Sequence, residues 1–561
     1  MSSTPTEELG LPIEPMAVQP VRKSRRPLLI AGAIAGVLAV VGGAWAVKSF
    51  LLPGAQPAEA LPASTIAYLA VDLDPSASQK IEAYQFLKRF PTIKRDLSLD
   101  AQDKASKNWF DALTKDSKCK NLDFAKDVEP WLGARASVAL VDLGEKTPTV
   151  VGVVQVTDEA AAKTGLKAIS ACAGDIGFAV DGDWAVLGEK ASQAEKVIAD
   201  AARGSLADDK TFQTWIGQLG DPGIVTMYSS PAAGKALIDS GLGDLMSSPA
   251  GMSGPGVSED EYFKAYDKHC KRPASAKCQK FLNDPNLGPG SAVPEEPTIS
   301  DETRKQLEDY AGGAASIGFV DGALQAELAV SSDKVLLATG ANVDSLVAGL
   351  PADSAMVASA AFKKGWVSDF FDELSTFGFP TSDFVKSLEQ DLGLSIADME
   401  TLFGTRTAFA FGPGVFDSSA DSSDPSTMPL GLLAEGDPAA IEAALDKLRG
   451  SSTFTDRAAP TLVSETVDGR VAFGFQQAYV TALASGDGKL GSTADFKNLV
   501  GTSHPAAEIV YLNFDAEHWL DSAVADADPS VKENLKPLVG LGITAWLDGK
   551  YQHSVIRLSN E

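Results

Sequence analysis

The chain of 561 residues is poor in cysteine, histidine and positive charge. It has four cysteines and four histidines, and 48 Lys+Arg stand against 75 Asp+Glu, for a formal net charge of -27. So few cysteines exclude a disulfide-dense small scaffold. A surface this acidic repels phosphate backbones, which argues against nucleic acid as a partner. Hydrophobic residues at 44% and charged residues at 22% are ordinary globular usage, which excludes disorder or fibre for the bulk of the chain.

One long uncharged run stands out, from Leu28 to Val47. As a helix it would be about 30 Å long, which matches the hydrocarbon core of a bilayer. Basic residues gather just before this run: Arg22, Lys23, Arg25 and Arg26. Because cytoplasmic flanks collect basic residues, we expect a single-pass anchor with the N-terminus in the cytoplasm and the C-terminal domain outside the membrane.

Several residues of the run refine this expectation. Trp45 lies near the outer end, where an indole suits the headgroup region. Gly32 and Gly36 form G-x-x-x-G, a pattern that favours a homodimer through the anchor. The alternative is an export signal cleaved after Ala60. Both interpretations place the large domain outside. Residues 1–26 contribute a charge of +1 and Lys48 another +1, which leaves -29 for the exported part.

The order of sequence signals repeats along the chain. Leu61-Pro62-Ala63 and Leu350-Pro351-Ala352 each open an alternating, strand-like run. The segments DVEPWLG and DMETLFG each predict a short helix, an end at glycine and a strand. Asp-Gly pairs that begin at positions 181, 321, 468 and 548 predict hairpins. Segments around Phe212 and Phe496 each predict a helix before a strand. Together these signals predict a two-fold internal repeat.

We therefore expect an α+β fold, in which an N-terminal single transmembrane helix precedes a two-fold repeated ectodomain of antiparallel sheets with packed helices. The expected parts are a disordered cytoplasmic tail (1–26), the anchor (27–52), a linker (53–60), the first repeat (61–333) with a Pro/Gly-rich insert (246–300), a second linker (334–349) and the second repeat (350–561). One helix should start at Pro75, capped by Asp74. Its predicted core face comprises Ile81, Tyr84, Leu87 and Phe90.

Three motifs carry a family resemblance: LPASTIAYLAVDLDPS, the KRFP one helix later, and DVEPWLG. They resemble an actinobacterial family of exported, single-span proteins, the domain of unknown function 3352. The family-motif residues are Asp74, Pro75, Trp131 and Gly133. The resemblance implies a location in the envelope of a high-GC Gram-positive bacterium. It transfers no catalytic residue, because the family has no established chemistry.

The cysteines are expected in an oxidising compartment, where thiols pair. They are Cys119, Cys172, Cys270 and Cys278, and three connectivities are open. Pairing of 119 with 172 and of 270 with 278 is the simplest, because Cys270 and Cys278 lie close together inside the insert. A zinc site at His269, Cys270 and Cys278 would lack an evident fourth ligand.

No catalytic, cofactor-binding or metal-binding residue is assigned from the sequence. The chain has no G-x-S-x-G elbow, Walker A loop or H-E-x-x-H pair. The four histidines (His269, His504, His518 and His553) stand at no ligand spacing, and Asp417, Asp421 and Asp424 lack the calcium-loop pattern. The tryptophans Trp109, Trp131, Trp184, Trp215, Trp366 and Trp546 fall in apolar contexts and are expected in the core.

The first functional hypothesis is a non-enzymatic, membrane-anchored envelope protein that binds or scaffolds another envelope component, most simply a protein. Its anchor contacts the lipid bilayer through residues 28–47. The alternative is an envelope hydrolase or transferase whose site is built from dispersed carboxylates. A third hypothesis, signal relay, rests on Thr4 and Thr6 beside Glu7 and Glu8 in the tail.

Overall fold

The computed structural model describes residues 56–72, 75–96, 122–173, 176–220, 223–240, 301–331, 336–376, 381–415, 425–455, 460–501, 504–516, 519–524 and 527–561. The predicted tail, the anchor and the Pro/Gly-rich insert lie outside these residues. Among the described helices, none combines the length and the apolar character that a bilayer crossing requires.

The first half of the described chain contains η1 (Pro57–Ala60), β1 (Thr65–Asp72), α2 (Ala77–Leu87), α3 (Pro91–Asp96), the π-helical η2 (Phe124–Val128), β2 (Leu132–Val141), β3 (Thr149–Val156), α5 (Glu159–Ala173), β4 (Gly177–Asp181), β5 (Trp184–Gly188), α6 (Ala191–Ala201), α7 (Lys210–Ile216), β6 (Val225–Ser229), α8 (Ala232–Ser240), α12 (Asp301–Glu308), β7 (Gly313–Val320) and β8 (Ala323–Ser331).

The second half contains α13 (Asp344–Ala348), β9 (Met356–Ala360), α14 (Trp366–Thr376), α15 (Thr381–Leu392), α16 (Ile396–Phe403), β10 (Arg406–Phe411), η4 (Pro425–Thr427), β11 (Leu430–Glu435), α17 (Pro438–Arg449), α18 (Ser452–Thr455), β12 (Val463–Val467), β13 (Arg470–Gly474), α19 (Gln477–Ser485), η5 (Leu490–Ser492), α20 (Ala494–Val500), β14 (Glu508–Asn513), α21 (Trp519–Ala523), α22 (Pro529–Leu535), β15 (Leu538–Asp548) and β16 (Tyr551–Asn560).

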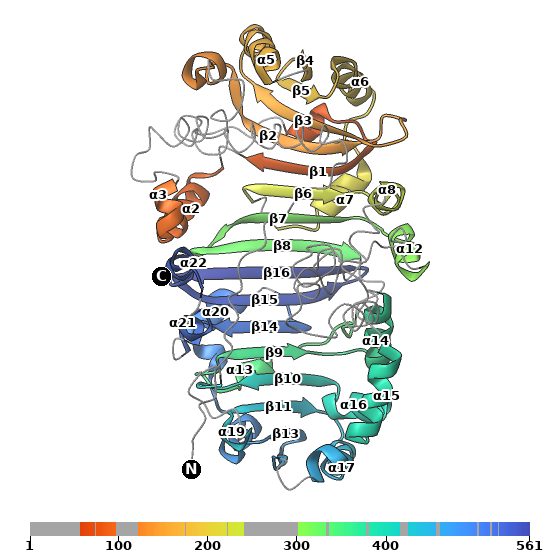
Figure 1. The fold of residues 1–561 in the computed structure, drawn as a ribbon, viewed down its shortest axis with the longest axis vertical. Helices are drawn as coiled ribbons and strands as arrows, with labels where there is room; N and C mark the ends of the chain where they lie inside the picture. Colours follow the sequence, from red (N-terminus) through yellow and green to blue (C-terminus); the bar gives the residue numbers. More distant parts are fainter. Residues whose placement is uncertain are drawn as a thin grey trace, which may run out of the picture.

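All of these strands form one antiparallel sheet. Its sixteen strands follow the order β12-β13-β11-β10-β9-β14-β15-β16-β8-β7-β6-β1-β2-β3-β5-β4. Read outward from the centre, each half has the same strand order, with β9 to β16 in the places of β1 to β8. The fold is therefore α+β with a large antiparallel sheet, as expected. Where a sheet in each repeat was expected, however, the two halves share a single sheet (Figure 1).

The two halves meet along β8 and β16, which we call the seam. Eight residue pairs join these strands, from Tyr551 opposite Ser331 to Leu558 opposite Leu324. In Figure 1 the green β8 lies beside the dark blue β16 at the middle of the molecule. Because the seam is a ladder of backbone hydrogen bonds, the halves are continuous rather than two bodies on a linker.

All four Asp-Gly pairs lie at hairpins, in two different ways. Asp321-Gly322 and Asp468-Gly469 occupy both central positions of their turns with positive φ, the conformation of a type I′ turn. In the other two hairpins the aspartate ends the strand, and Gly182 (φ 55°) or Gly549 (φ 58°) takes the first central position. The sequence signal therefore located each hairpin, and the exact turn differs by one residue.

The sheet has a covered face, on which helices bury two large apolar clusters. In the first half α6 and α7 pack on Tyr68, Val153 and Tyr228. In the second half α13, α19 and α20 pack on side chains such as Val357 and Tyr511. The two clusters correspond closely: Tyr228 meets Phe212 edge-to-face at 5.0 Å, and Tyr511 meets Phe496 in the same way at 5.2 Å.

Both predicted linkers, in the residues that the structure describes, contain a helix that belongs to this packing. In η1, Ala58 is 1% exposed, and its carbonyl accepts a hydrogen bond from the Ala207 amide. In α13, Leu346 and Val347 are buried in the cluster of the second half. Apolar residues within the short segments before Leu61 and Leu350 therefore complete each core.

The helix after β1 differs from its prediction. It begins at Ala77, and Ser76 is its N-cap because the Ser76 hydroxyl accepts a hydrogen bond from the Gln79 amide. Pro75 precedes the helix, and Asp74 lies outside the described residues. The predicted core face is wrong for Ile81 and Tyr84, which are 57% and 42% exposed. Phe86, together with the predicted Phe90, makes the contact with the sheet instead.

Candidate functional site

The other side of the sheet, which we call the open face, carries apolar side chains that are only partly covered. Helices pack over its ends, with α5 and η2 at one end and α16 and α17 at the other. Between them the strand registers place Leu69, Met227, Ala315 and Leu328 in one row that crosses the seam to Ser554. Leu69 is 37% exposed and Val330 is 38% exposed, unusually high for strand leucine and valine at the centre of a sheet.

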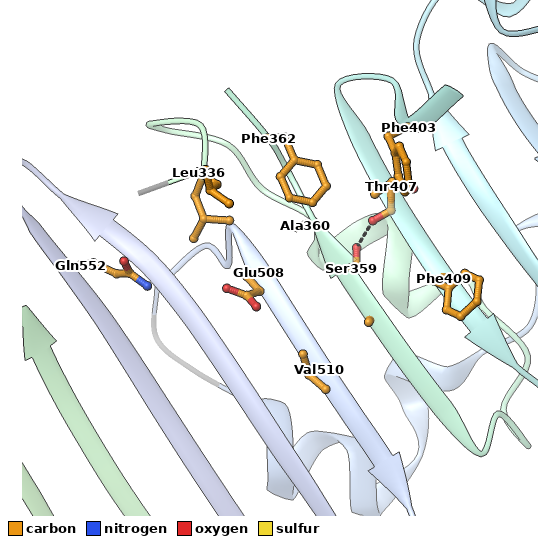
Figure 2. Close-up of a pocket in the computed structure, with 12 residues that line it drawn as sticks. Leu336, Ser359, Ala360, Phe362, Phe403, Thr407, Phe409, Glu508, Val510 and Gln552 are labelled. Atoms are coloured by element: carbon orange, nitrogen blue, oxygen red, sulfur yellow. Dashed lines mark hydrogen bonds between the residues drawn. The ribbon is translucent and has the colours of Figure 1, made fainter. Parts of the chain in front are cut away.

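The same row ends in a cavity of about 470 Å³ on the second half, which we call the Glu508 pocket. Its lining comprises Leu336, Leu337, Ala358, Ser359, Ala360, Phe362, Phe403, Thr407, Phe409, Glu508, Val510 and Gln552. Strands β9, β10 and β14 form the floor. Figure 2 shows the Glu508 carboxyl at the centre, with Gln552 on one side and Phe362 on the other. A cavity of this size is typical of a small-molecule site.

Glu508 is the polar group that sets the chemistry of this pocket. It is half-buried on β14, opposite Ala360 of β9 and Ala545 of β15. Within the described residues its carboxyl makes no hydrogen bond and no ion pair. Burial raises the pKa of Glu508 above its usual range, and no nearby cation of the described chain offsets this effect. The pocket therefore holds an acidic group whose charge lacks a described partner.

An aromatic cluster lies beside the carboxyl. Phe362 stacks on Trp366 with ring centroids 3.9 Å apart, and Trp366 meets Phe403 edge-to-face at 5.2 Å. The indole N–H of Trp366 is buried and has no hydrogen-bond acceptor in the described structure. These contacts fix the orientation of the Phe362 and Phe403 rings. The pocket thus combines an aromatic wall with one acidic group and the neutral polar side chains of Thr407 and Gln552.

The equivalent strands of the first half carry different residues at the positions of the Glu508 pocket. In the second half Ala360 pairs with Glu508 on one side and with Thr407 on the other. In the first half Val71 pairs with Val225 and with Ala136 in the same arrangement.

Continued across the next strands, this register places Leu324 of β8 where Gln552 stands in β16. The polar residues of the pocket therefore replace valine, alanine and leucine. The matching strands of the first half pair without a carboxyl at this position, so the pairing of the sheet does not require one.

Another buried titratable feature lies on the covered face, around Trp546. The Trp546 ring is stacked between His504, at 4.8 Å, and His553, at 5.1 Å. Burial lowers the pKa of His553, His504 lowers it further and Asp548 raises it. Nδ1 of His553 is buried without a hydrogen-bond partner among the described residues. This stack faces away from the Glu508 pocket. His269 and His518 lie outside the described residues.

The family-motif residues have structural roles. Trp131 is 2% exposed, and its indole N–H donates to the Asp127 carbonyl at 2.7 Å. Gly133 lies inside β2, against the Gln155 side chain, so the predicted helix end at this glycine is wrong. The matching Gly404 does end a helix, α16, with φ 64°. Trp184, Trp215 and Trp546 are buried as expected, and Trp109 lies outside the described residues.

Most of the remaining predicted residues lie outside the part of the chain that the structure describes. The described residues do not include the anchor positions Leu28, Gly32, Gly36, Trp45 and Val47, the basic residues Arg22, Lys23, Arg25 and Arg26, or the acidic loop residues Asp417, Asp421 and Asp424. Cys172 is half-buried on α5 and is disulfide-bonded. Cys119, Cys270 and Cys278 lie outside the described residues, so the pairing stays a prediction. The described residues contain no cluster of three metal-ligand side chains.

The Glu508 pocket was missed by sequence reasoning. The strand ending in YLNF was recognised, but its opening glutamate had no partner in the sequence that would mark it. The available signal was the comparison of the repeats, since Glu508 and Val225 each stand three residues before a matching tyrosine, Tyr511 and Tyr228.

Comparison with known proteins identifies the family of the N-terminal part. No curated protein and no solved structure matches the chain. Residues 28–175 match a family model described as "Protein of unknown function (DUF3352)". The match runs from the predicted anchor through β1, β2 and β3 to α5, and it includes the Trp131 motif. Over these residues the chain is similar to the DUF3352 family, which the sequence motifs also indicated.

Proposed function

We propose that the chain is a binding module of the cell envelope, held to the membrane by residues 28–47 and exposed outside it. The observation that carries the proposal is the Glu508 pocket, an apolar cavity with a few convergent polar groups on a broad sheet. Within the described part of the pocket Glu508 is the one carboxyl. A hydrolase or transferase that works by a carboxyl pair needs a second one, so the pocket favours binding over the enzymatic alternative.

The placement of η1 supports an anchor that is retained rather than cleaved. Cleavage after Ala60 would remove Ala58 and Ala60, which are 1% and 7% exposed in the core of the first half. A chain that started at Leu61 would therefore lose part of its packing. The glycines Gly32 and Gly36 favour dimerisation of the retained anchor.

A protease experiment on wall-stripped cells tests the topology. Protease added outside should degrade the bulk of the chain and leave a tag at the N-terminus protected. Cleavage of that tag, or a soluble chain that begins at Leu61, would contradict the anchored topology.

Site-specific photo-crosslinking in living cells tests the binding function. A photoreactive residue replaces Phe409, which lines the pocket, and a matched variant carries it at Val138, the corresponding position of the first half. We expect a discrete adduct at 409, absent when Glu508→Val is added, and none at 138. Equal capture at both positions, or no adduct at 409, would contradict a specific site in the pocket.

A further inference from the structure

We infer that the Glu508 pocket recognises a small organic cation, an ammonium or similar group carried on an apolar body. This inference rests on the proposed binding function and specifies its ligand class. The pocket offers one acidic group, a few neutral polar side chains and a largely apolar wall, which together complement a molecule with one positive end.

The first argument for a cationic ligand is that the carboxyl of Glu508 lacks a partner among the described residues. A half-buried carboxylate is costly unless an opposite charge or hydrogen-bond donors accompany it. Gly220 shows how this fold satisfies another such group: its backbone N–H donates to Glu327 at 3.1 Å on the covered face. The carboxyl of Glu508 has no such donor among the described residues. A bound ammonium would supply both the positive charge and the N–H donors.

The surrounding residues provide the second argument. The Phe362 ring is held by its stack on Trp366, and Phe403 and Phe409 add further aromatic surface around the cavity. Aromatic surfaces attract cations through the ring quadrupole, and they also accommodate an apolar body. Figure 2 shows Phe362 and Glu508 on adjacent parts of one cavity, so one ligand can contact both.

The asymmetry of the halves provides the third argument. At the corresponding positions the first half has Val225, Ala136 and Leu324, and it folds into the same eight-strand arrangement. The carboxyl is therefore dispensable for the sheet. The net charge of -27 also favours a cation, because an acidic surface concentrates positive ligands around the molecule.

Two matched probes test the inference on the full-length chain. 2-Phenylethylammonium and 2-phenylethanol share the same body and differ in the charge of one end. Binding is measured by calorimetry at pH 7 and at low salt for the wild type, Glu508→Gln and Glu508→Val. Glu508→Gln keeps the shape of the side chain, and Glu508→Val copies the first half.

We expect the wild type to bind the ammonium probe about tenfold more tightly than the alcohol, and both variants to lose this preference. Val225→Glu adds a carboxyl to the first half and serves as the control for charge alone. It should not raise the affinity for the ammonium probe by as much as Glu508 does in the second half.

Three results would overturn the inference: equal binding of both probes by the wild type, an unchanged preference in Glu508→Gln, or no binding of the ammonium probe. If both probes bind equally, the pocket still binds ligands and the proposed function stands. If neither binds, the crosslinking experiment at position 409 decides the proposed function separately.

Discussion

Arg557 provides a quantitative test of how the two halves are joined. Its side chain projects from β16 at the seam. Nε donates to the Gln325 side chain of β8 at 2.8 Å, and Nη1 donates to the carbonyls of Asn498 and Gly501, at 2.9 and 3.1 Å. One guanidinium thus ties the last strand of the first half to α20 of the second. Burial lowers the pKa of Arg557, which indicates a partly desolvated charge.

The expected cost of Arg557→Met follows from these contacts. Hydrogen bonds to a charged group contribute about 1.5–3 kcal/mol each, so three of them are worth several kcal/mol. Removal of the charge also relieves its desolvation, which offsets part of this loss. We therefore expect the free energy of unfolding to fall by about 3 kcal/mol. Arg557→Lys retains the charge but loses the planar fork of the guanidinium, so its free energy of unfolding should fall by about half as much.

Urea unfolding of the full-length chain measures this loss, and hydrogen exchange locates it. The amides of β8 and β16 should lose protection in Arg557→Met more than those of β2 and β3. Arg203→Met is the control, because Arg203 is 72% exposed and its ion pair lies within the first half. A loss below about 0.5 kcal/mol for Arg557→Met, the range of neutral surface changes, would refute the reasoning.

Three further predictions concern single residues. Burial depresses the pKa of His553, so the unfolded chain binds more protons at this residue than the folded chain does below about pH 6.5. The stability of the protein should therefore fall as the pH drops through this window, and thermal melts from pH 7.5 to 5 should show a shallower fall for His553→Gln. Parallel curves for the variant and the wild type would contradict this. Gly404→Ala should cost about 3 kcal/mol or more, since φ is 64° and the new Cβ would lie 2.2 Å from the Glu435 carbonyl oxygen; an unchanged urea midpoint would disprove it. Glu508→Val should raise the free energy of unfolding by about 1 kcal/mol at pH 7. Burial raises the pKa of the Glu508 carboxyl, so the protonated carboxyl favours the folded state and this stabilising effect is lost as the pH rises. Equal urea midpoints for the variant and the wild type would count against this.

Local signals in the sequence predicted local structure well. Asp321-Gly322 and Asp468-Gly469 have the chemistry that a type I′ turn requires, so both hairpins could be located without the fold. The helices around Phe212 and Phe496 and the strands after them were predicted for the same reason: their patterns are contained within about twenty residues. Gly404 ended its helix as expected, because the positive φ at this helix end favours glycine.

Non-local features could not be predicted in the same way. Nothing in the residues of β8 specifies that its partner is β16, since backbone pairing between open edges depends on topology more than on side-chain identity. The helical spacing of Ile81 and Tyr84 suggested a core face. The residue of this helix that contacts the sheet is instead Phe86, which lies on a different face of the helix. From the sequence, Glu508 has the character of a polar residue at the start of a strand. Only the pairing of the strands places Ala360 and Thr407 beside it and forms the pocket.

The seam also has a consequence for biosynthesis. β8 ends at Ser331, whereas its partner β16 begins at Tyr551, about 220 residues further along the chain. Until that partner is made, the first half presents an open strand edge with the unpaired N–H and C=O groups that recruit other chains. Such a long wait slows folding and exposes a template for aggregation. The edge of β8 is therefore the part of the first half that stays exposed to such contacts until β16 pairs with it.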